Sequence, residues 1–162
     1  MVLKILTFKI LFIIFIFNCN NLNAQTITGG ARVIDGDTIH VGKNKIRLYG
    51  IDAPEKKQLC DFNKIKWSCG IQSSKALKNI IEDKNIKCQI KDIDKYERFI
   101  AICFVDKVNI NKLMVKNGWA IAYRYFSLEY IDEEENARIK KLGIWKGNFQ
   151  IPYQYRKSKK KY

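Results

Sequence analysis

Acidic residues gather in two short, turn-like segments of a chain that is otherwise strongly basic. One is Asp35-Gly36-Asp37-Thr38, the other is Asp52-Ala53-Pro54-Glu55, and Arg47 lies between them. Grouped carboxylates repel one another, and a bound metal ion is the simplest way to offset that repulsion. The guanidinium fork of an arginine matches the oxygens of a phosphate. The spacing therefore indicates a metal site beside a phosphate-binding arginine.

The sequence favours a hard metal ion at this site. The single histidine is His40, and the cysteines are better explained as disulfides, so no nitrogen or sulfur ligand set accompanies the carboxylates. Oxygen ligands alone favour calcium or magnesium over zinc. A mechanism that needs two histidines is excluded by the count. We expect His40, which stands in an apparent strand, to lie at the surface.

Length and charge restrict the class of protein. The chain has 162 residues, enough for one domain with a hydrophobic core, and its formal net charge is +14. Such an excess attracts nucleic acid by displacing condensed counterions, but it also suits an anionic membrane or simple solubility. The carboxylate clusters favour nucleic acid among these alternatives.

The first 24 residues have the order of a secretory signal peptide. Lys4 and Lys9 precede an apolar run from Ile10 to Phe17, and a polar stretch ends at the small residue Ala24. The run is too short to span a bilayer comfortably, which takes about 20 apolar residues. We predict a signal peptide over 1–24, cleaved after Ala24, and a secreted or periplasmic product. An uncleaved anchor is the alternative.

Four cysteines follow this segment: Cys60, Cys69, Cys88 and Cys103. In an oxidising compartment their expected fate is disulfides rather than free buried thiols. Four cysteines allow three connectivities, and the sequence does not select one by itself. We favour Cys60–Cys69, which closes a short loop, and Cys88–Cys103, whose members lie at similar depths from the turn of a predicted hairpin.

The expected secondary structure combines short strands with a few helices. Stretches rich in Ile, Val and Thr predict five strands, at Thr26–Ile34, Thr38–Val41, Lys45–Tyr49, Ile86–Ile90 and Phe99–Val105. Apolar spacing and end signals predict three helices, at about 70–82, 109–117 and 129–142. The order indicates an α+β fold: a five-stranded OB-fold-type β-barrel with about three helices, over residues 25–150. Residues 151–162 carry a block of like charge without apolar periodicity, which predicts a basic flexible tail.

A family resemblance is carried by several motifs in order and at similar spacing. They are Ile34-Asp35-Gly36-Asp37-Thr38, Arg47-Leu48, Gly50-Ile51-Asp52-Ala53-Pro54-Glu55, Asp94-Lys95-Tyr96-Glu97-Arg98, the segment Asn111 to Ala120, Ala122-Tyr123-Arg124-Tyr125, and Ala137-Arg138 followed by Gly143-Ile144-Trp145. Together they resemble the staphylococcal nuclease (thermonuclease) family, from about Ala31 to Trp145.

The resemblance implies a calcium-dependent phosphodiesterase that cuts DNA and RNA with little base specificity and leaves 3′-phosphate ends. Its calcium ligands would be Asp37, Asp52 and the backbone carbonyl of Ala53. The partners it implies are the DNA and RNA substrates. We expect a monomer with no stable protein partner and no membrane association after signal cleavage.

The same resemblance assigns the catalytic roles. Arg47 and Arg98 would grip the scissile phosphate, and Glu55 would activate water. Attack on a phosphodiester builds charge on its equatorial oxygens, and two guanidinium groups with a divalent cation are suited to stabilise that charge. A glutamate beside the metal can accept a proton from water at neutral pH.

Substrate binding would use aromatic and basic side chains near these groups. The resemblance favours Tyr96 and Tyr123, because a sequence-tolerant nuclease gains binding by stacking on bases. Lys95 would either contact a neighbouring phosphate or simply be exposed, and Tyr125 would either touch substrate or pack in the core. Glu97 departs from the family, in which many members have glycine. It stands where a turn would favour positive φ, and it would lower activity if it paired with Arg98.

Two other readings remain open at this point. One is an OB-fold module that binds nucleic acid without cutting it. Such a module would be expected to have lost one of the acidic or arginine residues named above, and all are present. The other is a membrane-surface protein that uses the leader as an anchor and the C-terminal residues as a basic patch.

Overall fold

A computed structural model of the chain describes residues 25–159. The predicted signal peptide, residues 1–24, lies outside the described residues. Among those described, none of the helices has the length and apolar character needed to cross a membrane.

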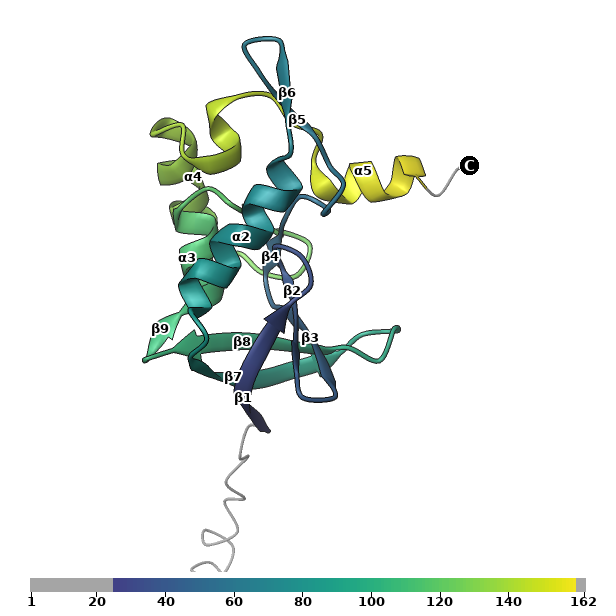
Figure 1. Cartoon of the computed structure of the whole chain (residues 1–162), viewed down its shortest axis with the longest axis vertical. Coiled ribbons are helices and arrows are strands. Elements are labelled where there is room, and N and C mark those ends of the chain that lie inside the picture. The colour runs from purple at the N-terminus through teal and green to yellow at the C-terminus, as the bar shows by residue number, and fades with distance from the viewer. Residues whose placement is uncertain (1–24, 160–162) are drawn as a thin grey trace, which may run out of the picture.

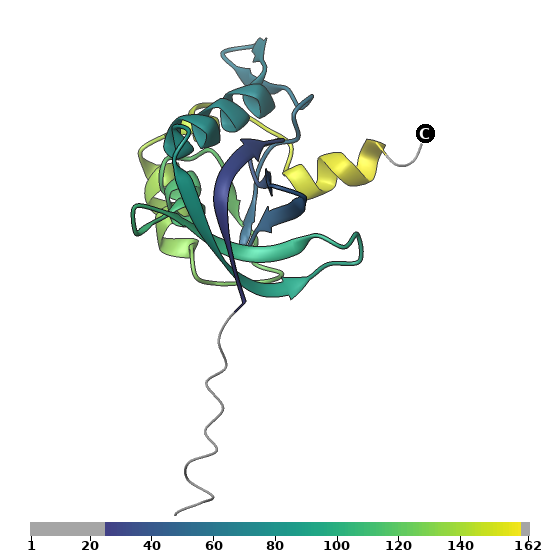
Figure 2. The ribbon, with the colours of Figure 1, turned by 60° about the horizontal axis from the view of Figure 1, so that its bottom comes forward.

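Five strands curl into a closed barrel, as predicted. They are β1 (Thr26–Val33), β2 (Thr38–Val41), β3 (Asn44–Leu48), β7 (Asn85–Ile93) and β8 (Phe99–Val105). Their order in the sheet is β3-β2-β1-β7-β8, and a parallel pairing of β3 with β8 closes the ring. Figures 1 and 2 show the barrel from two sides. Side chains alternate between its two faces, so Ile39, Val41, Ile46 and Leu48 all turn into the core.

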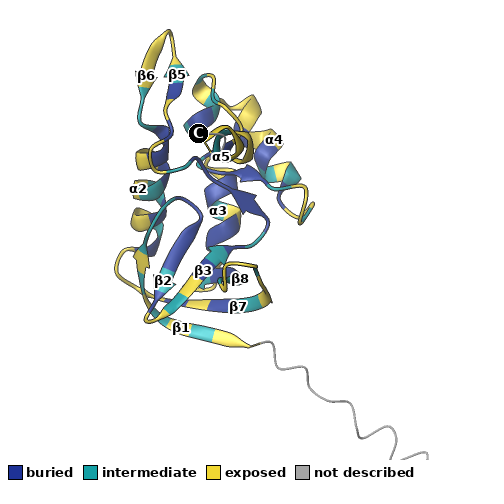
Figure 3. Cartoon of the chain, turned by 90° about the vertical axis from the view of Figure 1, so that its right-hand side faces the viewer, coloured by how far each residue is buried: buried dark blue, intermediate teal, exposed yellow. Residues whose placement is uncertain are grey.

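Helices cover one side of the barrel and complete its core. They are α2 (Cys69–Ile81), α3 (Ile110–Lys116) and α4 (Ile131–Ile139), followed by a 3-10 turn, η1 (Gly143–Lys146). Helix α3 begins where the sequence predicts, since the Asn109 side chain accepts a hydrogen bond from the Lys112 N–H. Buried residues from α2 and α3, such as Leu77 and Met114, pack against the strands, and Figure 3 shows this interior in dark blue.

Short strands connect the barrel to its surroundings. They are β4 (Ile51–Asp52), which pairs with β10 (Ile121–Ala122), the hairpin of β5 (Cys60–Phe62) and β6 (Ile65–Trp67), and β9 (Val108–Asn109) beside β8. The β4–β10 pairing matters for the site, because it places Asp52 directly opposite Ile121 in the interior of the protein.

Both favoured disulfides are confirmed. Cys88 and Cys103 are directly paired residues of β7 and β8, and their bond lies in the barrel core. Cys60 and Cys69 join the start of β5 to the first residue of α2. The second bond anchors the segment that follows the acidic turn at Asp52 to a helix of the core.

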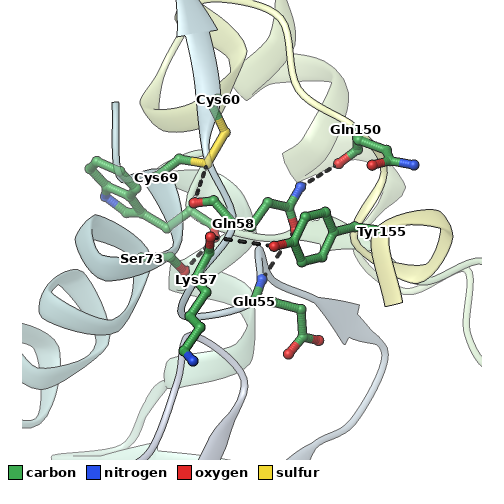
Figure 4. Close-up of a disulfide and its surroundings, with 9 residues drawn as sticks. Glu55, Lys57, Gln58, Cys60, Cys69, Ser73, Gln150 and Tyr155 are labelled. Atoms are coloured by element: carbon green, nitrogen blue, oxygen red, sulfur yellow. Dashed lines mark hydrogen bonds between the residues drawn. A yellow bond between two sulfur atoms is a disulfide. The ribbon is translucent and has the colours of Figure 1, made fainter. Parts of the chain in front are cut away.

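The prediction of a flexible basic tail over residues 151–162 is wrong for most of that segment. Pro152–Lys159 form helix α5, which begins at a buried proline. The Gln58 amide donates a hydrogen bond to the carbonyl of Gln150 just before the helix, at 2.6 Å. The Tyr155 hydroxyl donates to the carbonyl of Lys57 at 3.4 Å (Figure 4). These contacts are polar and distant in sequence, so no apolar period signalled the helix. Residues 160–162 lie outside the described residues.

We expect the double variant Cys60→Ala, Cys69→Ala to be less stable by about 2–3 kcal/mol, because the bond limits the unfolded chain over a short loop. Urea unfolding under non-reducing conditions measures this change, with the wild-type protein as reference. The Cys88–Cys103 bond, checked by mass spectrometry, should remain intact in both. An unchanged unfolding midpoint would show that the Cys60–Cys69 bond does not stabilise the fold.

Candidate active site

An open pocket of about 1100 Å³ lies between the barrel, the β7–β8 turn and α5. It brings together six residues that the sequence singled out for catalysis or substrate binding: Arg47, Glu55, Lys95, Tyr96, Arg98 and Tyr123. They come from β3, the turn after β4, the β7–β8 turn and the segment after β10. In Figures 1 and 2 the β7–β8 turn and α5 both project from the same side of the molecule.

The floor of the site is an arginine held between two buried carboxylates. Arg47 donates from Nη1 to Asp37 Oδ1 at 2.7 Å and from Nη2 to Asp52 Oδ1 at 2.9 Å. The Ala53 N–H donates to the other Asp37 oxygen at 2.8 Å, and the Thr38 hydroxyl donates to Oδ1 at 3.0 Å. The three residues predicted to hold calcium are therefore brought together around Arg47.

Glycine is required in the first acidic turn for a steric reason. A Cβ on Gly36 would overlap the Ser73 hydroxyl of α2 and crowd the side chain of Ala53. The turn therefore presses against both the helix and the second acidic segment. Asp35 keeps the turn in shape, since its Oδ1 accepts a hydrogen bond from the Asp37 N–H at 3.1 Å.

Burial and mutual repulsion shape the electrostatics of this floor. Burial and the neighbouring Asp37 charge raise the pKa of Asp35 to about 7. Burial, reinforced by Asp37, also raises the pKa of Asp52, although Arg47 and Arg156 oppose the change. For Arg47, burial acts to lower the pKa, but the two carboxylates outweigh it and the net shift is upward. Burial is thus the largest cause of the raised pKa of both carboxyl groups, and the charge of Asp37 adds to it.

The donor set fits a hard divalent cation. Asp52 Oδ2 is fully buried and has no hydrogen-bond partner among residues 25–159. A buried carboxylate oxygen without a partner is costly, and a cation would satisfy it. In the same part of the chain, no group of three or more His, Cys, Asp or Glu side chains is placed to hold a metal. A cation here would therefore rely on two carboxylates, Asp37 and Asp52, with backbone oxygen such as that of Ala53.

The second predicted arginine is held by an aspartate in its own turn. Arg98 Nε donates to Asp94 Oδ2 at 2.8 Å, and Nη2 lies 2.6 Å from the same oxygen. Asp94 Oδ1 accepts hydrogen bonds from the backbone N–H groups of Tyr96 and Arg98. No role was predicted for Asp94, although its i,i+4 spacing from Arg98 indicates an ion pair. Asp94 fixes both the turn and the direction of the guanidinium.

Comparison with known proteins agrees with this geometry. A family model described as staphylococcal nuclease homologue matches residues 45–147, more than half of the chain. An uncharacterized endonuclease of Haemophilus influenzae is 37% identical, over 80% of this chain and 72% of its own length. The chain belongs to the staphylococcal nuclease family.

Two further relatives carry different names. The micrococcal nuclease of Shigella flexneri is 30% identical, over 80% of this chain and 79% of its own length. The succinoglycan biosynthesis protein ExoI of Rhizobium meliloti is 32% identical, over 76% of this chain and 66% of its own length. The chain thus spans about two thirds to four fifths of the length of these relatives.

The departure from the family pattern at Glu97 has a local structural consequence. Glu97 adopts a φ of 59°, the left-handed region in which glycine is favoured, and its N–H donates to the Asp94 carbonyl at 2.9 Å. The partner of Arg98 is Asp94 and not Glu97. The substitution therefore strains the turn without capturing the arginine.

Helix α5 supplies pocket residues that the sequence analysis did not single out. Arg156 Nη1 lies 2.8 Å from both Asp52 Oδ1 and Glu55 Oε1, and Tyr153 and Lys157 line the same pocket. These residues fall outside every family motif found in the sequence and in a segment expected to be flexible. Basic composition was the one signal that pointed to them.

Gln58 was also missed, and it joins Glu55 to α5. Its side chain is fully buried. Its Oε1 accepts a hydrogen bond from the Glu55 N–H at 3.2 Å, and its Nε2 donates to the Gln150 carbonyl (Figure 4). A buried glutamine that satisfies two backbone groups fixes the path of both segments.

Aromatic side chains form one wall of the pocket around Tyr123. Its ring lies 5.1 Å from that of Phe126, 6.3 Å from Tyr125 and 6.4 Å from Tyr153, between centroids. Tyr125 is 82% exposed, so of the two roles considered for it, core packing does not apply. Tyr96, on the opposite turn, is also exposed and lies under the Lys95 ammonium. Exposed rings on two sides of a basic pocket suit stacking on nucleobases.

We expect Glu97→Gly to raise stability by about 1 kcal/mol, because glycine adopts the left-handed conformation without the Cβ penalty. Glu97→Ala is the matched control, since it removes the same charge but keeps the Cβ. Chemical denaturation of the three proteins compares them. Equal stabilisation by both variants would assign the effect to charge and contradict the backbone explanation.

A second prediction concerns the pH dependence of the Asp94–Arg98 pair. Partial burial raises the pKa of Asp94, but hydrogen bonds from Arg98 and Tyr96 outweigh it, so the pKa lies below its ordinary value of 3.8. A lowered pKa stabilises the fold above the unfolded value and loses that contribution as pH falls through the folded value. Asp94→Asn should lower the free energy of unfolding by about 1 kcal/mol at pH 7, and this difference should shrink as the pH falls below about 4. Urea unfolding across pH tests this, and a constant difference would refute it.

Proposed function

We propose that this protein is a calcium-dependent nuclease that hydrolyses phosphodiester bonds of DNA and RNA with little base specificity and leaves 3′-phosphate ends. The observation that carries the proposal is the convergence of Arg47, Glu55 and Arg98 on one pocket floored by Asp37 and Asp52. Family membership supports phosphodiester chemistry, and the buried, unpartnered oxygen of Asp52 supports a cation.

The arginines would bind the scissile phosphate and stabilise charge as it develops. Arg47 and Arg98 are each fixed by carboxylates, so little reorganisation is needed when substrate arrives. Preorganised donors of this kind each supply a few kcal/mol of transition-state stabilisation. Calcium, held by Asp37, Asp52 and the Ala53 carbonyl, would add Lewis-acid stabilisation of the same charge.

Glu55 is suited to take the proton from the attacking water. Its carboxylate is one third exposed at the pocket edge, while its backbone is tied to Gln58. One of its oxygens accepts a hydrogen bond from Arg156 Nη1 at 2.8 Å, which orients the carboxylate. The other oxygen remains to accept the proton.

Substrate would be bound through its backbone and through base stacking. Lys95 can contact a phosphate next to the scissile one, and Tyr96 and Tyr123 offer rings on either side of the pocket. Stacking tolerates every base because each has a π-face. This arrangement supports little base specificity on both DNA and RNA.

We also propose a secreted or periplasmic monomer that works without a stable protein partner. The two disulfides support an oxidising compartment, because such bonds are rare in cytosolic proteins.

Cleavage of single-stranded DNA and RNA, with calcium and then with a chelator, tests this proposal. We expect cleavage with calcium and its loss on chelation. Arg47→Ala and Glu55→Ala should each lower the rate at least about 100-fold. Arg138→Ala is the control, because Arg138 pairs with Glu135 on the exposed surface of α4. This variant should cut at the wild-type rate.

Each outcome bears on a separate part of the proposal. Cleavage that persists in chelator would reject the calcium assignment. Full activity in Arg47→Ala or Glu55→Ala would reject the assigned roles. Binding without any cleavage by the wild-type protein would show a nucleic-acid-binding module instead of an enzyme.

A further inference from the structure

We propose that Arg156 of α5 is a third phosphate-binding arginine, which makes the C-terminal helix part of the substrate site. This inference rests on the proposed nuclease function and extends it to a segment outside the matched family region, which ends at residue 147. The ligand is a backbone phosphate of the nucleic acid, bound by the free edge of the Arg156 guanidinium.

The three arginines of the pocket differ in which guanidinium nitrogens are already engaged by carboxylates. Arg47 uses both of its Nη groups on Asp37 and Asp52. Arg98 uses Nε and Nη2 on Asp94. Arg47 therefore has both Nη nitrogens engaged by two carboxylates, and Arg98 has its Nε–Nη2 edge engaged by one.

Arg156 differs from both in its free edge. Its Nη1 contacts Asp52 and Glu55, whereas its Nε and Nη2 make no hydrogen bond or ion pair with the residues in the described range 25–159. These two nitrogens form the side-on fork of a guanidinium, which binds two oxygens of a phosphate in parallel. The side chain is 28% exposed and lines the pocket.

The position of the guanidinium is fixed from both ends. On one side, the two carboxylates hold Nη1. On the other, α5 is tied to the segment after the second acidic turn through Gln58–Gln150 and Tyr155–Lys57, as Figure 4 shows. Binding groups on a rigid element lose little entropy when the ligand arrives. Arg156 is thus placed before substrate binds.

The charge of the helix supports the same ligand. Helix α5 contains three basic residues, Arg156, Lys157 and Lys159, and its sequence PYQYRKSK includes no acidic one. Lys157 lines the pocket beside Arg156, and Tyr153 extends the aromatic wall towards Tyr123. A strand of nucleic acid that leaves the scissile position along α5 would meet cations spaced along its phosphates.

A competing explanation makes the opposite prediction. If Arg156 served to block the acidic site, its removal would free Asp52 and Glu55 for a cation, and cleavage would become faster. If it binds phosphate, its removal weakens DNA binding and slows cleavage.

The first experiment measures the salt dependence of binding to single-stranded DNA in chelator, where no cleavage occurs. We expect Arg156→Gln to reduce the slope of log K against log salt by about 0.7, the value for one lost phosphate contact. Arg156→Lys, which keeps the charge, should retain the wild-type slope. Arg138→Gln, which removes an arginine from the surface of α4, should also retain it.

The second experiment measures cleavage with calcium. We expect Arg156→Gln to lower kcat/KM at least about 30-fold, and Arg156→Lys not to restore it, because an ammonium cannot form a parallel pair of bonds. Thermal unfolding of each variant checks that the fold is retained.

The outcomes separate this inference from the proposed function. An unchanged salt slope in Arg156→Gln would overturn the phosphate contact, whether or not the protein cuts DNA. Faster cleavage than wild type would also overturn it and show a blocking role. Full recovery of rate by lysine would overturn the side-on geometry. If the wild-type protein does not cut, the nuclease proposal fails, but the salt slope still decides the role of Arg156.

Discussion

Arg47 holds two buried carboxylates on the two ends of one guanidinium group, Asp37 from the turn before β2 and Asp52 from β4. The two acids would repel each other strongly in the interior, and breaking such a buried group by removing one partner is costly. The Arg47 guanidinium between them therefore sets the distance between the two acidic turns. Because Arg47 sits in β3 opposite Thr38, the register of the barrel fixes where that cation lies.

A second set of contacts carries this geometry to the C-terminus. Gln58, buried beside the Cys60–Cys69 disulfide, is bonded to the backbone of Glu55 on one side and to that of Gln150 on the other (Figure 4). Arg156 of α5 in turn contacts the carboxylate of Glu55, which gives a second connection between the same two segments. The disulfide, the proposed base and helix α5 are thus connected by direct contacts, although Glu55 and Arg156 are 101 positions apart in the sequence.

The sequence predicted the barrel from local signals, because stretches rich in Ile, Val and Thr define the strands. The family resemblance, carried by the motifs, assigned Arg47, Glu55 and Arg98 to one site, and all three line the same pocket. The sequence did not predict Arg156 or Gln58, since each acts through polar contacts with residues far along the chain. A helix held by such contacts shows no apolar period, and its basic residues therefore predicted a flexible tail.

The distribution of charge explains how a basic pocket can recognise a polymer without reading its sequence. Acidic partners fix the positions of its arginines. The guanidinium nitrogens that are not bound to these partners therefore have set positions. Phosphates are the groups that such nitrogens bind best, and phosphate contacts carry no base information. In the proposed nuclease, the exposed rings of Tyr96 and Tyr125 would add stacking, which every base can provide. Affinity would then come from backbone charge and ring faces, and any discrimination between substrates would have to come from the shape and flexibility of the strand that enters.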